Sequence, residues 1–175
     1  MRRKSGFTII EVSLVLAIGG LILMMVFVAL PSLQRSQRDA QRREDIISLI
    51  ENIKKYQQNN RGALPSGESG GESSEFTRNV ALEAKGWQVL LNNYLGENFK
   101  DPNGEPYILT ITDSASYLNN TTEFNNILMD NSKILIVKQA TCSGNSNGNK
   151  VERANPRKLA ALYELEVGGT FCANT

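Results

Sequence analysis

Residues 7–33, FTIIEVSLVLAIGGLILMMVFVALPSL, set the architecture of this chain and hold its longest apolar run. Residues 12–33 carry no formal charge. A helix rises about 1.5 Å per residue, so these positions span roughly 33 Å, which matches the hydrocarbon core of a bilayer. Gly19, Gly20 and Pro31 disfavour a soluble helix but are tolerated in a membrane-spanning one. The segment is therefore predicted to be a transmembrane helix.

A secretory signal peptide and a simple single-span anchor are two plainer interpretations of this segment. Basic residues 2–4 followed by an apolar stretch are typical of a signal peptide, and Ala29 is a candidate cleavage residue. Glu11 argues against both, because an ionised carboxylate in an apolar helix costs on the order of 2–3 kcal/mol near the bilayer centre. A cut after Gly6 would give Phe7 a free amine, one helical turn from Glu11 and on the same face.

Residues 4–12, KSGFTIIEV, resemble the type IV prepilin signal, in which a short basic leader is followed by Gly, Phe-Thr and a Glu four residues after the Phe. The resemblance implies that a prepilin peptidase cuts between Gly6 and Phe7 on the cytoplasmic side and N-methylates Phe7. It also implies that Glu11 pairs with the Phe7 amine of a neighbouring subunit during assembly. Residues 1–6 are then a cleaved leader, and 7–33 form the transmembrane and filament-core half of a long helix.

This resemblance predicts a structural subunit of a type IV pilus-like extracellular filament that serves adhesion, motility or DNA uptake. The expected partners are identical or related pilin subunits, the prepilin peptidase, the pilus assembly machinery and, before assembly, membrane lipid. The chain would be a single-pass protein of the cytoplasmic membrane with its N-terminus inside, and after assembly it would lie in a pilus at the cell surface. Two alternatives stay open: a pseudopilin of a type II secretion or competence system, and a single-span membrane-anchored binding domain.

The position of the proline departs from the family pattern. Many such pilins carry a proline 21 residues after the Phe, where this sequence has Val28, and its own proline follows three residues later at Pro31.

Composition argues against an enzyme. There are 19 Lys and Arg against 18 Asp and Glu, and loss of three cations with the leader leaves a net charge of −2, so no strong field attracts nucleic acid. The chain has no histidine, which excludes His-based triads and His metal sites, and two cysteines cannot form a four-thiolate zinc site. No nucleophile–base spacing or glycine-rich phosphate loop is present. We therefore expect no catalytic residue, no cofactor and no metal.

The helix is expected to continue through residues 34–60, because Ser32 to Asn60 contain no Gly or Pro. If residues 7–60 form one helix, it is about 80 Å long. Apolar side chains recur at three- and four-residue steps along its second half and form one stripe for burial: Ile46, Leu49, Ile50, Ile53 and Tyr56. Residues 34–45 are polar on every face, and the arginines there are interpreted as solvated or facing a neighbouring subunit, with a lipid-phosphate anchor as the alternative.

Residues 61–175 are predicted to form a globular pilin head. Its first part, 61–105, is expected to hold an exposed loop at 61–75 and a short helix from about Phe76 to Leu95, in which Trp87 anchors the core. Asp101-Pro102-Asn103-Gly104 has the residues of a β-turn. A plain turn is favoured over a calcium site, because four nearby oxygen ligands lack the spacing of an EF-hand: Asp101, Asn103, Glu105 and Asp113.

The second part of the head, 106–175, contains three runs that read as strands, at 106–112, 133–139 and 159–167, with a polar loop at 143–156. They predict a small antiparallel sheet of three or four strands whose apolar face covers the stripe of the helix, since neither element can bury itself alone. The fold class is therefore α+β, with a long N-terminal helix packed by its second half on this sheet.

Cys142 and Cys172 are expected to form a disulfide. The membrane segment that precedes them places them on the exported side, where a pair is oxidised. The position also resembles the disulfide-closed C-terminal loop of many pilins. Closing about 30 residues stabilises a domain by roughly 3–4 kcal/mol in the chain-entropy model.

Overall fold

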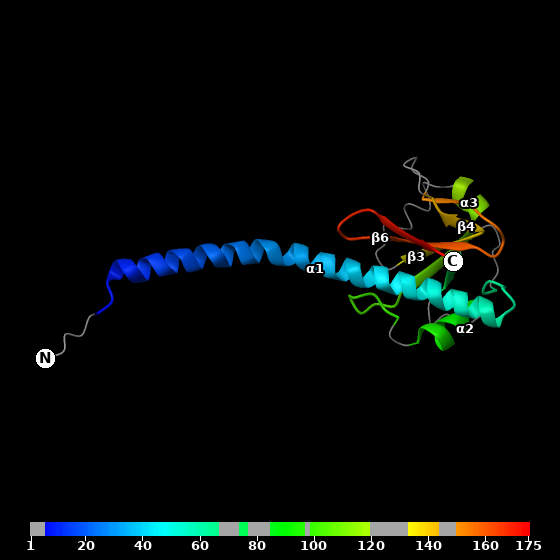
Figure 1. The fold of residues 1–175 in the computed structure, drawn as a ribbon, viewed down its shortest axis with the longest axis horizontal. Helices are drawn as coiled ribbons and strands as arrows, with labels where there is room; N and C mark the ends of the chain where they lie inside the picture. Colours follow the sequence, from blue (N-terminus) through cyan, green and yellow to red (C-terminus); the bar gives the residue numbers. More distant parts are fainter. Residues whose placement is uncertain (1–5, 67–73, 77–84, 97–98, 120–132, 144–149) are drawn as a thin grey trace. The chain divides into compact units, whose positions relative to one another are not determined.

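The computed structural model describes residues 6–66, 74–76, 85–96, 99–119, 133–143 and 150–175. The chain divides into two compact units, Met1–Gln37 and Arg38–Thr175. The apolar residues 7–33 are called the stem. The second unit, Arg38–Thr175, is called the head from here on, and it includes residues 38–60 besides the predicted 61–175. The described secondary structure is one long helix, three shorter helical segments and seven strands, shown in Figure 1.

Helix α1 runs from Ile9 to Asn59, close to the predicted 7–60, with Pro31 inside it. Proline lacks the N–H that would bond the preceding turn, yet α1 continues through this position without a break. The last part of α1, from Arg38 on, belongs to the head. There the predicted stripe is buried, and Ile46, Leu49 and Ile53 are fully so.

The stripe of α1 packs on one face of a five-stranded sheet (Figure 1). Alternate residues of the strands supply the other side of this core, because successive side chains of a strand point to opposite faces. The sheet residues in this core include Leu109, Ile111, Ile134, Ile136, Leu159 and Ala161. The head is thus built as predicted, with helix and sheet burying one another.

The strands of the sheet lie in the order β1-β2-β3-β6-β7. Their bounds are Ser74–Phe76 (β1), Ile108–Asp113 (β2), Lys133–Lys138 (β3), Leu159–Glu164 (β6) and Thr170–Asn174 (β7). The predicted sheet of three or four antiparallel strands is corrected in two ways: there are five strands in this sheet, and β2 pairs with β3 in parallel, with Leu109 opposite Ile134.

The parallel pair is possible because residues 114–132 separate the two strands. A parallel connection needs a dozen or more residues, whereas a hairpin needs only two. Helix α3, Ser114–Asn119, opens this connection. The other three neighbouring pairs are antiparallel, as predicted.

A second, smaller core covers the opposite face of the sheet. Strands β4 (Ala140–Cys142) and β5 (Val151–Arg153) form a two-stranded ribbon, and β5 lies in the segment predicted to be loop. The ribbon and α3 together cover side chains of β3 and β6. The members of this core include Tyr117, Leu135, Val137, Val151 and Leu162. Both faces of β3 and β6 are therefore covered, which accounts for their nearly continuous apolar sequence.

The predicted helix 76–95 is present only in part. Phe76 belongs to β1, residues 77–84 lie outside the described residues, and the helical part is α2 (Lys85–Val89) followed by a π-helical turn, η1 (Leu90–Leu95). Trp87 is fully buried in the core, as expected. Gly86 passes the backbone of Ser66 so closely that a Cβ would lie 2.2 Å from the Ser66 nitrogen, so this position requires glycine.

Candidate functional site

The start of α1 is held by a reciprocal pair of side chains. Thr8 donates its backbone N–H to Glu11 Oε2 at 2.9 Å and its hydroxyl to the same oxygen at 2.7 Å. The Glu11 N–H in turn points to Thr8 Oγ1 at 3.4 Å. This is a capping box, in which the residue before the helix and the third helical residue satisfy each other's backbone groups. Both bonds from Thr8 reach Oε2, and no described residue donates to Oε1.

The capping box gives Glu11 a role within its own chain. The resemblance to the prepilin signal implies an amine on another subunit as the partner of this carboxylate, and the structure adds two donors from Thr8. The signal was present in the sequence as Thr8-x-x-Glu11, the pattern that marks a helix start. A carboxylate at this position also meets the positive end of the helix dipole.

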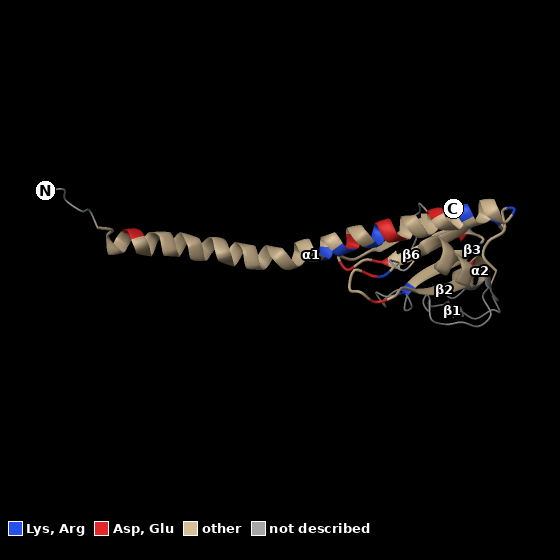
Figure 2. Ribbon diagram, turned by 90° about the horizontal axis from the view of Figure 1, so that it is seen from below, with Lys and Arg blue, Asp and Glu red and all other residues tan. Residues whose placement is uncertain are grey.

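The stem presents its apolar side chains outward. Phe7 is 90% exposed, Ile9 88% and Val28 81%. No Lys, Arg, Asp or Glu follows Glu11 along α1 until Arg35, and Figure 2 shows this part of α1 in tan. By length and composition α1 is apolar enough to cross a membrane, the one such helix among the described residues. An apolar surface of this extent marks an interaction with lipid or protein.

In the head, Arg42 is the centre of a buried ion-pair network, in a part of α1 that Figure 2 shows to be rich in charge. Its guanidinium is fully buried and forms a two-pronged pair with Asp101, Nε to Oδ2 at 2.7 Å and Nη2 to Oδ1 at 3.1 Å. Nη1 also donates to Asp39 at 3.2 Å and to Glu166 at 2.5 Å. The planar fork of arginine matches carboxylate geometry, so one cation here joins α1 to two distant segments.

Asp39 and Arg38 extend this network to the turn between β6 and β7. Asp39 accepts the backbone N–H groups of Glu166 and Val167, each at 2.9 Å. Arg38 forms a second two-pronged pair with Glu166, at 2.9 and 2.6 Å. Hydrogen bonds from Arg38, together with those from Arg42, lower the pKa of Glu166 to about 2. The turn of the hairpin is thus fixed to the first turns of the helix in the head.

The interpretation of the arginines as solvated or facing a neighbour is wrong for two of them. Arg42 is inside the head and Arg38 is paired with Glu166, while Arg35 and Arg43 are exposed. The signal that was missed is spacing. Asp39 and Arg42 lie on the same side of α1 as the apolar stripe that begins at Ile46, so both side chains point toward the core.

The turn at Asp101–Gly104 forms as predicted, with the Gly104 N–H bonded to the Asp101 carbonyl at 2.7 Å. Both carboxylate oxygens of Asp101 are engaged by Arg42, and Tyr163 adds a hydroxyl bond at 3.3 Å. Asp101 is therefore a structural partner of Arg42. Within the described ranges, no group of three or more His, Cys, Asp or Glu is placed to hold a metal ion.

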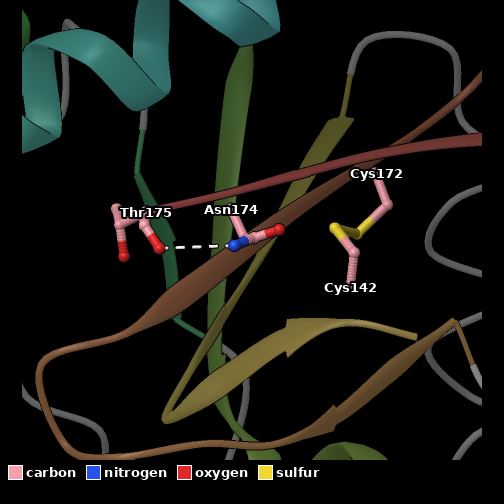
Figure 3. The surroundings of a disulfide bond; sticks show 4 residues. All are labelled: Cys142, Cys172, Asn174 and Thr175. Atoms are coloured by element: carbon pink, nitrogen blue, oxygen red, sulfur yellow. Dashed lines mark hydrogen bonds between the residues drawn. A yellow bond between two sulfur atoms is a disulfide. The ribbon is translucent and has the colours of Figure 1, made fainter. Parts of the chain in front are cut away.

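Cys142 and Cys172 form a disulfide between β4 and β7, with their Cα atoms 5.9 Å apart (Figure 3). The bond ties the two-stranded ribbon to the edge strand of the main sheet. Since β7 pairs only with β6 among the described strands, the disulfide gives this C-terminal strand a second attachment.

Comparison with known proteins identifies the amino-terminal region. The family described as the prokaryotic N-terminal methylation motif matches residues 1–27. No curated protein matches the chain, and neither does any solved structure. The matched region contains Gly6, Phe7, the Thr8–Glu11 box and most of the stem. The motif implies processing by a prepilin peptidase, and it supports a type IV pilin-like or pseudopilin family. Residues 1–27 of this chain are therefore the class III signal peptide of type IV pilins and pseudopilins.

Proposed function

We propose that the chain is a non-enzymatic structural subunit of a type IV pilus-like filament, cut between Gly6 and Phe7, methylated on Phe7, and assembled through its stem. The observation that carries the proposal is the methylation motif at residues 1–27, joined to a stem whose apolar side chains are exposed. Adhesion, motility or DNA uptake would be the activity of the filament, not of the single chain.

The stem supplies the driving force for assembly. Exposed apolar surface costs about 25 cal/mol per Å² in water, so the stem has to pass from lipid to another apolar surface without being hydrated. Stems of other copies provide that surface in a filament core. Identical or related subunits are therefore the proposed partners, and the chain moves from the cytoplasmic membrane to the cell surface.

Glu11 supplies the register of addition. Its Oε2 is engaged by Thr8, but an ionised carboxylate accepts about four hydrogen bonds, so Oε1 remains suited to an ammonium group. Cutting after Gly6 creates such a group on Phe7. In an apolar setting an ion pair is stronger than in water, so a neighbouring Phe7 amine at the level of Glu11 is favoured over any other axial position.

The N-terminal mass of the mature protein tests the processing step. We expect loss of residues 1–6 together with the addition of one methyl group to Phe7. An intact N-terminus would support the anchored binding domain instead, and a cut near Ala29 would support a signal peptide; either result would overturn the proposal.

Glu11→Gln tests the pairing step, because it removes the charge and keeps the shape. The variant should insert in the membrane as the natural chain does but give few or no filaments. Ser13→Ala is a matched control, since it removes a nearby polar group, which among the described residues donates to the carbonyl of Ile9 at 2.8 Å. Normal filament yield from Glu11→Gln would refute the role of the charge.

Deletion of the chain distinguishes a pilin from a pseudopilin. If this is a pilin, filaments at the cell surface should contain this subunit and disappear on deletion. Unchanged surface filaments, with a loss of protein secretion or of DNA uptake, would favour the pseudopilin, because the two classes share the motif.

A further inference from the structure

The capping box sets where α1 begins relative to the bond that is cut. Gly6, Phe7 and Thr8 are non-helical, and the first helical residue is Ile9. The first i to i+4 bond of this region runs from the Val12 N–H to the Thr8 carbonyl, at 3.3 Å. The carbonyls of Gly6 and Phe7 therefore lie ahead of the helix and take no part in its ladder.

Without the cap, these two carbonyls are the next acceptors in line. The N–H groups at the start of a helix have no partner within it, and in an apolar environment an unsatisfied N–H costs several kcal/mol. One more turn would let Ile10 donate to Gly6 and Glu11 donate to Phe7. Such a turn would enclose the Gly6–Phe7 peptide bond, and its carbonyl would become a helical acceptor.

We propose that Thr8 is a positioning residue for processing: its capping bonds with Glu11 hold the Gly6–Phe7 bond in non-helical backbone, where a peptidase can bind it. The inference rests on the proposed function and adds how the cleavage site is presented. Hydrolysis adds the hydroxyl of water to the Gly6 carbonyl carbon and its proton to the Phe7 nitrogen. The attacked carbonyl thus has to be free of the helix.

The exposure of the site agrees with this role. Phe7 is 90% exposed, and a Cβ at Gly6 would meet no atom within 4 Å. The glycine is therefore not required by crowding inside this chain. Gly6 and Phe7 are both exposed, so an enzyme can approach the bond between them.

Cleavage kinetics of the full precursor in lipid vesicles, with a purified prepilin peptidase, test the proposal. Thr8→Val removes the hydroxyl at nearly constant volume, and we expect KM to rise by up to about fivefold, the equilibrium shift of a lost cap, with kcat unchanged. The reason is that only the fraction of precursor with a non-helical site can bind. Thr8→Ser keeps the hydroxyl, so its KM should lie within twofold of that of the natural chain. The KM of Ser13→Ala should lie within the same range.

A conformational measurement supports the kinetics. The dipeptide Gly-Phe occurs once in the chain, so ¹³C-carbonyl glycine with ¹⁵N-phenylalanine labels a single peptide bond, Gly6–Phe7. In the uncut precursor, Thr8→Val should move its carbonyl shift toward helical values, and Thr8→Ser should not.

The outcomes separate this inference from the proposed function. If the natural chain is cut after Gly6 but Thr8→Val has an unchanged KM or an unchanged carbonyl shift, the positioning role is overturned and the proposed function stands. If the natural chain is not cut at this bond at all, the proposed function falls and the positioning role falls with it.

Discussion

Replacing Arg42 with alanine removes the one cation that faces three carboxylates inside the described part of the head. Asp101 and Asp39 are each 4% exposed, so water cannot replace the lost partner, and Asp101 loses a two-pronged pair. Removing one side of a buried ion pair typically costs about 3–5 kcal/mol, because the remaining charge is left desolvated. We therefore expect Arg42→Ala to lower the free energy of unfolding of the head by about that amount, a large part of the roughly 5–15 kcal/mol of an ordinary domain.

Urea unfolding of the full chain in detergent micelles measures this loss. Trp87 is the only tryptophan and is fully buried in the core of the head, so its fluorescence reports unfolding of the head and not of the stem. Arg42→Lys should fall between the natural chain and Arg42→Ala. A lysine keeps the charge but cannot form the two-pronged pair with Asp101.

Arg43→Ala is the matched control, since it removes the same side chain from the next position of α1, where it is exposed. A loss of less than about 1 kcal/mol is expected there, as for exposed charges in general. If Arg42→Ala costs no more than Arg43→Ala, the network does not hold α1 to the sheet and the reasoning is refuted.

Three further predictions concern the head. The folded pKa of Glu166, about 2, lies below the unfolded value, so its contribution to stability is present above the unfolded pKa and is lost as pH falls through about 2; urea unfolding at a series of pH values should show stability falling between about pH 5 and pH 2, with a flatter profile for Glu166→Gln. Replacing both Cys142 and Cys172 with serine should cost roughly 3–4 kcal/mol and abolish any effect of a reductant on urea unfolding, and an unchanged midpoint would show that the bond is idle. Gly86→Ala should lower the free energy of unfolding by about 1–3 kcal/mol in the same assay, because its Cβ would overlap the backbone of Ser66; an unchanged free energy would contradict this close approach of the two backbones.

The buried arginine illustrates what a sequence pattern conceals. Arg42 lies on the face of the stripe, but a charged side chain is buried only if its partners are in place, and these come from positions 101 and 166. No residue near Arg42 in α1 predicts those partners. The same holds for β7, a five-residue strand whose pairing with β6 depends on a turn held by Asp39.

The capping box is the opposite case, because its signal is local. Thr8 and Glu11 are three residues apart, and their spacing alone predicts that they meet at a helix start. The resemblance to a prepilin signal implies a different partner, an amine on another subunit. The structure supplies a donor within the same chain, and the two explanations are compatible because Thr8 bonds to Oε2 and leaves Oε1 for the proposed amine.

The stem, the stripe of α1 and the central strands could be predicted from the amino-acid sequence, because each depends on periodicity or composition within a short window. The methylation motif could be identified there by its resemblance to the prepilin signal. The parallel pairing of β2 with β3, the five-stranded order and the burial of Arg42 became visible only in the folded head. These features depend on which distant segments contact one another. The free energy of such a contact depends on both segments, so neither segment predicts it alone.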